Sequence, residues 1–321
     1  LQNYENPLVR PMSKQTLFLL IFVVHTASAG FERYYDLVVS DAGRSVLPQN
    51  GVRITYLGTN GYQFEAGHHA LLVDPYFSRV GIPAIIFGAA IQPDAQRIND
   101  AMKHLAPMAD TILVTHGHVD HLFDAPPLMK ITGARLLASG TAVELAEAAG
   151  APPQRCDAVA RGDVRQIGPW KIHVIGASHD RVFPIGVPFP GPRKNKASPK
   201  KAADWVCGEP LSFLIEIHGQ RIFIDAGGTR SLLPPANIGP VDLAILGVAL
   251  PDSRARFPEA VRRLRPRYVL PSHQDNFFRP LDRGFVFGPL TDFPRVLRDD
   301  KREQLPGQLI LLDYFQPWTL R

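Results

Sequence analysis

The chain has 321 residues, of which 45% are hydrophobic and 20% charged, so it is long enough to bury one large core or two small ones. A net charge of +5 is mild for this length and argues against a dedicated nucleic-acid-binding protein. The apolar content excludes a disordered chain, and 30 prolines and 26 glycines without a repeating pattern exclude a fibrous one. The only cysteines, Cys156 and Cys207, exclude a disulfide scaffold and leave open one bridge between them.

The first 29 residues are predicted to contain an export signal. Lys14 supplies a positive start, residues 17–24 form an apolar run, and Ala27 and Ala29 are small residues at the positions that a signal peptidase reads. The run is too short to span a bilayer, which needs ~20 apolar residues in a helix. We therefore predict cleavage after Ala29 and a mature domain over 30–321 that is periplasmic or secreted and has no transmembrane segment.

Short apolar segments bounded by glycines predict strands at the start of the mature chain, and strand and helix patterns alternate after them. The predicted strands span 52–57, 62–65, 70–73, 111–114, 135–138, 164–167, 172–175, 211–217, 221–224, 242–248, 267–270 and 309–315. The predicted helices span 94–105, 141–149 and 257–264, and another begins at Asp124. This order favours a single α/β domain in which two sheets pack face to face with helices outside.

The densest cluster of chemically active side chains directly follows the strand predicted over 111–114. It reads Thr115-His116-Gly117-His118-Val119-Asp120-His121. In an extended loop, positions two apart face the same way, so His116 and His118 can share one metal ion. Asp120 and His121 come after the chain turns and can address a second ion. Imidazole and carboxylate ligands without thiolate are typical of a divalent metal at a hydrolytic site.

Three other predicted strands end in residues of the same kinds. His179 follows one strand, Asp225 another and His273 a third. The carboxyl ends of strands are where open α/β sheets place their functional sites. These three residues are therefore further candidate metal ligands.

The HxHxDH pattern, followed by His, Asp and His at strand ends, resembles the metallo-β-lactamase superfamily from about Gly51 to the C-terminus. The resemblance implies a four-layer αββα sandwich. It also implies two divalent ions, most simply zinc, with manganese or iron as alternatives. The residues it assigns are His116, His118 and His179 for the first ion, Asp120, His121 and His273 for the second, Asp225 as the bridge between the ions, and Asp74 as a supporting residue outside the ligand set.

Asp225 at the bridging position argues against a true β-lactamase. The turn at 57–61, the pair Asp74-Pro75 and the segment 205–215 resemble the branch that contains ascorbate-6-phosphate lactonase and N-acyl phosphatidylethanolamine-hydrolysing phospholipase D. The resemblance implies an exported dinuclear hydrolase in which a hydroxide between the ions, oriented by Asp120 as the catalytic residue, attacks a phosphodiester or phospholipid-type ester bond. The alternatives are a lactonase or carboxylesterase with the same centre, and a metal-dependent binding module without turnover.

A proline-rich loop is predicted over 181–204, and it begins beside His179. Its basic residues, Lys194 and Lys196 among them, have no acid between 193 and 201 and can bind a phosphate, a carboxylate or an anionic lipid surface. The alternative is a solvated loop without a ligand. We expect a small-molecule or lipid-like ester substrate and no nucleic-acid partner. Three further candidate substrate contacts are Phe183 and Tyr76 as apolar walls and Asn276 as a polar group.

Overall fold

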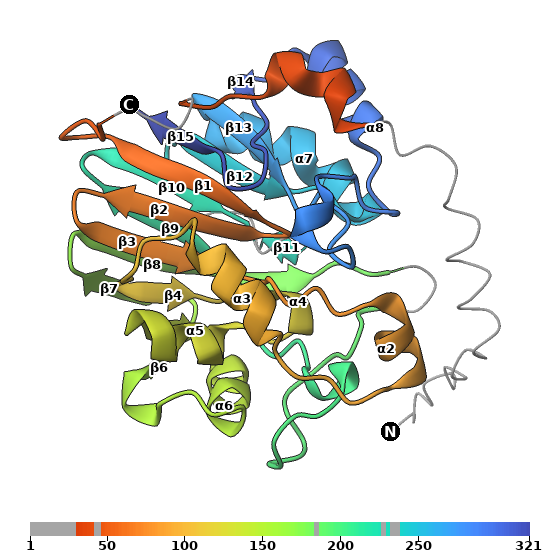
Figure 1. Cartoon of the computed structure of the whole chain (residues 1–321). Coiled ribbons are helices and arrows are strands. Elements are labelled where there is room, and N and C mark those ends of the chain that lie inside the picture. Colours follow the sequence, from red (N-terminus) through yellow and green to blue (C-terminus); the bar gives the residue numbers. More distant parts are fainter. Residues whose placement is uncertain (1–29, 42–45, 183–185, 226–228, 232–237) are drawn as a thin grey trace, which may run out of the picture.

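Two β-sheets lie face to face, and helices cover the outer surface of each (Figure 1). The arrangement comes from a computed structural model that describes residues 30–41, 46–182, 186–225, 229–231 and 238–321. It confirms the predicted α/β class, the αββα layers and the single domain. The predicted export signal and Phe183 lie outside the described residues. Within those residues, no helix has the length and apolar character needed to cross a bilayer.

The first sheet comes from the amino-terminal half of the chain, except for one edge strand from the carboxyl terminus. Strands β3 to β6 of this sheet run parallel to one another. The segment after β4 therefore leaves the same edge of the sheet as the segment after β3. In spatial order the strands are β15 (Pro317–Leu320), β1 (Val52–Gly58), β2 (Gly61–Ala66), β3 (His69–Val73), β4 (Thr111–Leu113), β5 (Arg135–Ala138) and β6 (Cys156–Ala158).

The second sheet comes from the carboxyl-terminal half. In spatial order its strands are β11 (Thr229–Ser231), β8 (Trp170–His179), β9 (Leu211–Ile217), β10 (Gln220–Ile224), β12 (Leu243–Gly247), β13 (Tyr268–Ser272) and β14 (Gln308–Leu309), and β7 (Val164–Ile167) pairs with β8. Strands β9 and β10 form an antiparallel hairpin, and His218 and Gly219 between them have φ of 50° and 79°, as a two-residue hairpin turn requires. Strands β10, β12 and β13 are parallel.

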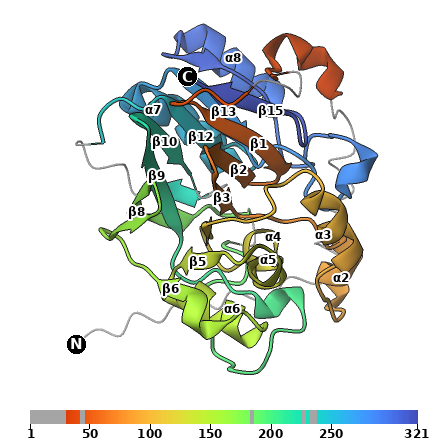
Figure 2. The ribbon, with the colours of Figure 1, turned by 60° about the vertical axis from the view of Figure 1, so that its left-hand side comes forward.

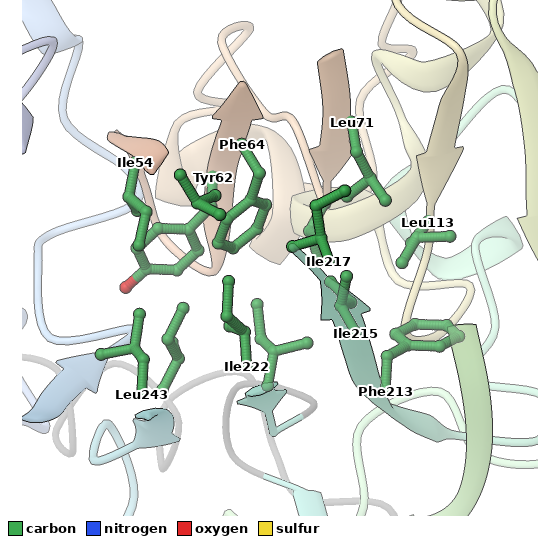
Figure 3. Packing of buried hydrophobic residues seen from close by; sticks show 14 of the residues in the cluster. Ile54, Tyr62, Phe64, Leu71, Leu113, Phe213, Ile215, Ile217, Ile222 and Leu243 are labelled. Atoms are coloured by element: carbon green, nitrogen blue, oxygen red, sulfur yellow. The ribbon is translucent and has the colours of Figure 1, made fainter. Parts of the chain in front are cut away.

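The core between the sheets is built from the inward side chains of both. Tyr62 and Phe64 of β2 face Ile215 of β9 and Ile222 of β10, and all four are fully buried (Figure 3). Burial of one such side chain stabilises the fold by roughly 1.5–3 kcal/mol. This layer fixes the two sheets against each other, and with them the strand ends that carry the candidate ligands.

Two further apolar clusters hold the helices on the outer faces (Figures 1 and 2). Helices α3 to α6 pack on the first sheet, and η1, α7 and α8 pack on the second. The α-helices are α2 (Ile82–Phe87), α3 (Ala95–Met102), α4 (Val119–Leu122), α5 (Ala125–Thr132), α6 (Gly140–Ala148), α7 (Pro251–Leu264) and α8 (Phe293–Glu303), and the 3₁₀-helices are η1 (Phe31–Leu37), η2 (Pro153–Arg155), η3 (Ala202–Asp204) and η4 (Leu281–Arg283).

Several sequence expectations differ from the structure. The strand predicted over 309–315 is wrong, because β14 ends at Leu309 and the last strand is β15. The apolar residues 310–312 that suggested a strand are buried in the core outside the named strands. Helix α2 was not predicted. Cys156 and Cys207 are both free thiols, so the bridge left open by the sequence is absent. The helix predicted to begin at Asp124 is α5, whose N-cap residue is Asp124; the carboxylate of Asp124 accepts hydrogen bonds from the Phe77 and Ser78 nitrogens and none from α5.

Candidate metal centre

The HxHxDH segment changes conformation part-way along its length. The backbone of His118 is extended, and this residue is the N-cap of the one-turn helix α4. This turn of helix, which the sequence did not indicate, places Asp120 and His121 beside His273, while the ring centroid of His121 still lies 3.9 Å from that of His116. A glycine is required at position 117, between His116 and His118, since a Cβ there would lie 2.3 Å from the backbone oxygen of Val206.

His116, His118 and His179 form the first group of candidate ligands, with one ring nitrogen of each within 4.8 Å of the others. Nε2 of His116 lies 3.0 Å from Nδ1 of His118. The backbone engages the outer nitrogens of the other two rings: Nε2 of His118 donates to the Pro188 oxygen at 2.9 Å, and Nδ1 of His179 donates to the Asp180 oxygen at 2.7 Å. These bonds fix the rings and leave Nδ1 of His118 and Nε2 of His179 for a ligand role.

Asp120, His121 and His273 form the second group, again within 4.8 Å. Oδ2 of Asp120 lies 3.2 Å from Nε2 of His273 and 3.4 Å from Nε2 of His121. His121 uses its other nitrogen, Nδ1, to donate to Oδ2 of Asp74 at 2.8 Å. The three side chains therefore converge through the atoms that a metal ion would need.

Asp74 is fully buried and stands behind both groups. Besides His121, its carboxylate accepts hydrogen bonds from the backbone nitrogen of Thr115 at 2.8 Å, from the Thr115 hydroxyl at 2.6 Å and from Nδ2 of Asn60 at 2.8 Å. The Thr115 hydroxyl is in turn 3.1 Å from Nδ1 of His116. These contacts are the ones that a supporting role of Asp74 requires, and the role itself stays a prediction.

Asp225 follows the end of β10 and is buried. Its backbone oxygen accepts from Nδ2 of Asn60 at 3.1 Å, and its carboxylate lies 4.0 Å from Nη2 of Arg256. Among the described residues, Asp225 belongs to neither of the two three-residue groups. Its bridging role stays a prediction.

The two groups differ in their electrostatics. Burial lowers the pKa of His118 to about 3 and that of His179 to about 4, so both rings are neutral at physiological pH. In the second group, Asp120 and Asp74 overcome the effect of burial and raise the pKa of His121 to about 10. Although burial opposes it, His121 and His273 hold the pKa of Asp120 well below its usual range. A neutral imidazole cluster beside an ionised carboxylate is the donor set that a divalent transition metal prefers.

The sequence profile described as Beta-lactamase superfamily domain matches residues 53–273, a span that contains every candidate ligand. This chain belongs to that superfamily. The superfamily resemblance is thereby confirmed, and the branch predicted from residues 57–61 stays a prediction.

Relatives within the superfamily match most of the chain. A UPF0173 metal-dependent hydrolase of Rubrobacter xylanophilus is 26% identical over 255 residues, which cover 78% of this chain and 90% of the relative. A UPF0173 metal-dependent hydrolase of Myxococcus xanthus is 28% identical over 245 residues, 75% of each chain. The fold is similar to that of Igni18, a metallo hydrolase from Ignicoccus hospitalis, with a TM-score of 0.54, 16% identity, and coverage of 84% of this chain and 99% of that one.

The residues predicted to contact the substrate, unlike the candidate ligands, do not gather at one place in the structure. Lys194 and Lys196 are exposed, and Lys194 lines a cavity of about 300 Å³ with Phe189, whose ring centroid is 6.5 Å from that of His118. Tyr76 was expected to form an apolar wall for the substrate, but the structure places it in the core. Its side chain is 1% exposed, and its hydroxyl accepts a hydrogen bond from the Val80 nitrogen. Asn276 is half-buried and accepts from the Phe278 nitrogen, which stabilises its own turn.

Sequence reasoning missed four polar residues around the centre. Asn60 links Asp74 and the Asp225 backbone, and its position in a Gly-bounded turn was the available signal. Arg256 of α7 makes bidentate contacts with the buried carboxylate of Asp180 at 2.9–3.2 Å. Arg79 and Asp275 form a fully buried ion pair at 2.8 Å, two residues from His273. No local sequence pattern marks either arginine.

Proposed function

We propose that this protein is a metal-dependent hydrolase whose two ligand groups hold two divalent ions, with zinc as the first choice. The observation that carries the proposal is the convergence of each group within 4.8 Å while second ring nitrogens are held by Pro188, Asp180 and Asp74. Such hydrogen bonds to the outer nitrogen of a ligating histidine are the usual means of fixing its orientation and tautomer. The names of the matched relatives support metal-dependent hydrolysis.

The chain's own residues define what happens at the centre. When bound, the ions would supply a water of lowered pKa and withdraw charge from the reacting group. Asp120 stays ionised because His121 and His273 stabilise its charge, so it accepts a hydrogen bond from the attacking water and orients it. Asp225 is assigned as the bridge between the ions. Asp74 holds His121 and the Thr115 backbone in place.

We further propose that the bond cleaved is a phosphodiester or phospholipid-type ester, as in the branch with N-acyl phosphatidylethanolamine-hydrolysing phospholipase D. The support is the exposed basic loop, which begins at a candidate ligand and places Lys194 beside a cavity near His118. A lactone or carboxylester substrate is the alternative for the same centre. We also propose that the export signal is cleaved after Ala29 and that the protein is periplasmic or secreted. Sequencing the amino terminus of the processed protein tests the cleavage site.

The deciding experiment combines elemental analysis with a substrate panel. The purified protein is expected to hold about two metal ions per chain and to hydrolyse bis(p-nitrophenyl) phosphate faster than p-nitrophenyl esters or lactones. His118→Ala is expected to lose both metal and turnover, whereas the control His68→Ala, at an exposed turn, keeps both. Hydrolysis of the esters or lactones without hydrolysis of the phosphodiester would show that the substrate is a carboxylester or lactone. Metal binding without turnover on any substrate would favour a binding module.

A further inference from the structure

Helix α2 is apolar on every side and yet contains no buried residue. Residues 81–91 read Gly-Ile-Pro-Ala-Ile-Ile-Phe-Gly-Ala-Ala-Ile, without a polar side chain. Ala84, Ile85 and Ile91 pack partly against the core cluster beneath the first sheet. A helix that is hydrophobic all round is normally buried, so the outer face of α2 calls for a partner.

The outward face of this segment is apolar along its length. Pro83 and Phe87, four residues apart on one side of α2, are exposed, and Ile86 beside them is partly exposed. The helix ends there, because Gly88 is in the left-handed conformation, and the exposed Ala89 and Ala90 follow outside the helix. Phe87 is 64% exposed.

Lysines border the same face. The Lys201 side chain reaches within 3.9 Å of the Cβ position at Gly88, and the Ile91 nitrogen donates to the Lys200 oxygen at 2.8 Å. In both views α2 lies beside the green segment around residue 203 (Figures 1 and 2). Both lysines are exposed, and among the described residues neither forms a salt bridge. The nearby Asp204 carboxylate accepts from the backbone nitrogens of Lys200 and Lys201.

From this combination we infer that α2 and the loop at 193–201 form a docking surface for an anionic lipid membrane. Exposed apolar side chains enter the boundary between headgroups and acyl chains, and neighbouring lysines bind anionic headgroups. A purely apolar partner surface would leave the lysines without a counter-charge. Lys194 and Lys196 extend the positive charge further along the same loop.

The chain connects this surface to the candidate metal centre. Residues 75–81 link Asp74 to α2, and in the basic loop the Pro188 oxygen accepts from Nε2 of His118 at 2.9 Å. We therefore expect a lipid of a bound membrane to reach the ligand groups from this side. That consequence rests on the proposed function, whereas membrane binding itself does not require turnover or metal.

The test measures co-sedimentation of the full chain with vesicles of phosphatidylcholine alone and of phosphatidylcholine with phosphatidylglycerol. Binding is expected only to the anionic vesicles and is expected to weaken as salt increases. Lys200→Glu/Lys201→Glu should weaken binding by more than about 25-fold, since each lysine near the surface contributes roughly fivefold. Ile86→Ser/Phe87→Ser should weaken it by more than about tenfold, since burial of even one such side chain contributes about that much.

Matched controls separate this surface from the rest of the molecule. Met108→Ser removes another exposed apolar side chain, 75% exposed, and Lys301→Glu reverses an exposed charge on α8. Both should bind as the unaltered chain does, and any contribution of residues 17–24 is common to all variants. Thermal melting checks that each variant is folded. Equal binding of the α2 variant and the controls, or no binding by the folded chain, overturns the proposal. His118→Ala should still bind vesicles, so loss of turnover alone leaves this inference intact.

Discussion

Nδ1 of His121 donates to Oδ2 of Asp74 at 2.8 Å, and both side chains are almost completely buried. This bond commits Nε2 of His121 to the side that faces Asp120. It also connects the ligand group to β3, because Asp74 directly follows that strand. The orientation of the second ligand group therefore depends on a residue outside it.

Replacing Asp74 with asparagine should weaken metal binding at the second group by about 10–100-fold, since removal of such supporting groups has this effect in metal sites. The amide cannot accept from Thr115, Asn60 and His121 together as the carboxylate does. Chelator competition measures the affinity. The control is Asp110→Asn, which alters a carboxylate paired with the exposed His69. Unchanged affinity in Asp74→Asn would refute the supporting role.

Metal occupancy of the two groups should respond differently to pH. With pKa values of about 3 and about 4, His118 and His179 are already neutral at pH 6, so protons do not compete at the first group. The pKa of His121 is about 10, so below that value a metal must displace a proton from it. Affinity at the second group should then fall about tenfold for each unit of decreasing pH. Metal content after dialysis at pH 8 and pH 6 tests this: loss from both groups in parallel would contradict it.

Arg256 should act as a positioning residue for the first group. Its guanidinium holds Asp180, whose backbone oxygen orients His179. Arg256→Met should lower the free energy of unfolding by about 3 kcal/mol, because it removes the bidentate partner of a buried carboxylate. It should also weaken metal binding to the His179 group, while Arg263→Met, on an exposed pair of the same helix, changes neither. A loss of stability with unaltered metal affinity would reduce Arg256 to a purely structural role.

The buried pair of Arg79 and Asp275 makes a stability prediction. Neither side chain is exposed, and Asp275 also accepts from the Thr59 nitrogen and the Tyr314 hydroxyl. Arg79→Met should cost roughly 3–5 kcal/mol, because it removes the cation from a buried carboxylate. Lys103→Met breaks an exposed pair with Asp100 and should cost less than about 1 kcal/mol. Urea unfolding compares them, and similar costs would show that the buried pair contributes little.

The sequence could predict residues whose position follows from a local pattern, and it could not predict contacts between distant parts of the chain. His179 ends β8 and His273 directly follows β13, so the local strand pattern was enough to find them. Arg256 and Arg79 meet their partners across 76 and 196 residues of chain, and no local pattern encodes such contacts. Tyr76 resembles a cleft residue in sequence, but its burial depends on how α3 and the first sheet pack. Helix α2 lacks the polar positions that would reveal a helical period.

Gly117 offers the most local test of the histidine pair. A methyl group there would lie 2.3 Å from the Val206 oxygen and 2.9 Å from Cδ1 of Leu145, and that backbone cannot easily retreat because the Gly117 nitrogen donates to the Cys207 oxygen. Gly117→Ala should therefore displace His116 and His118 and weaken metal binding at the first group by at least about tenfold. Gly140→Ala adds the same methyl group where nothing lies within 4 Å. That control should keep its metal affinity and change stability by no more than about 1 kcal/mol. Zinc titration of both variants decides the point, because equal affinity would mean that the two histidines do not depend on the backbone path that Gly117 permits.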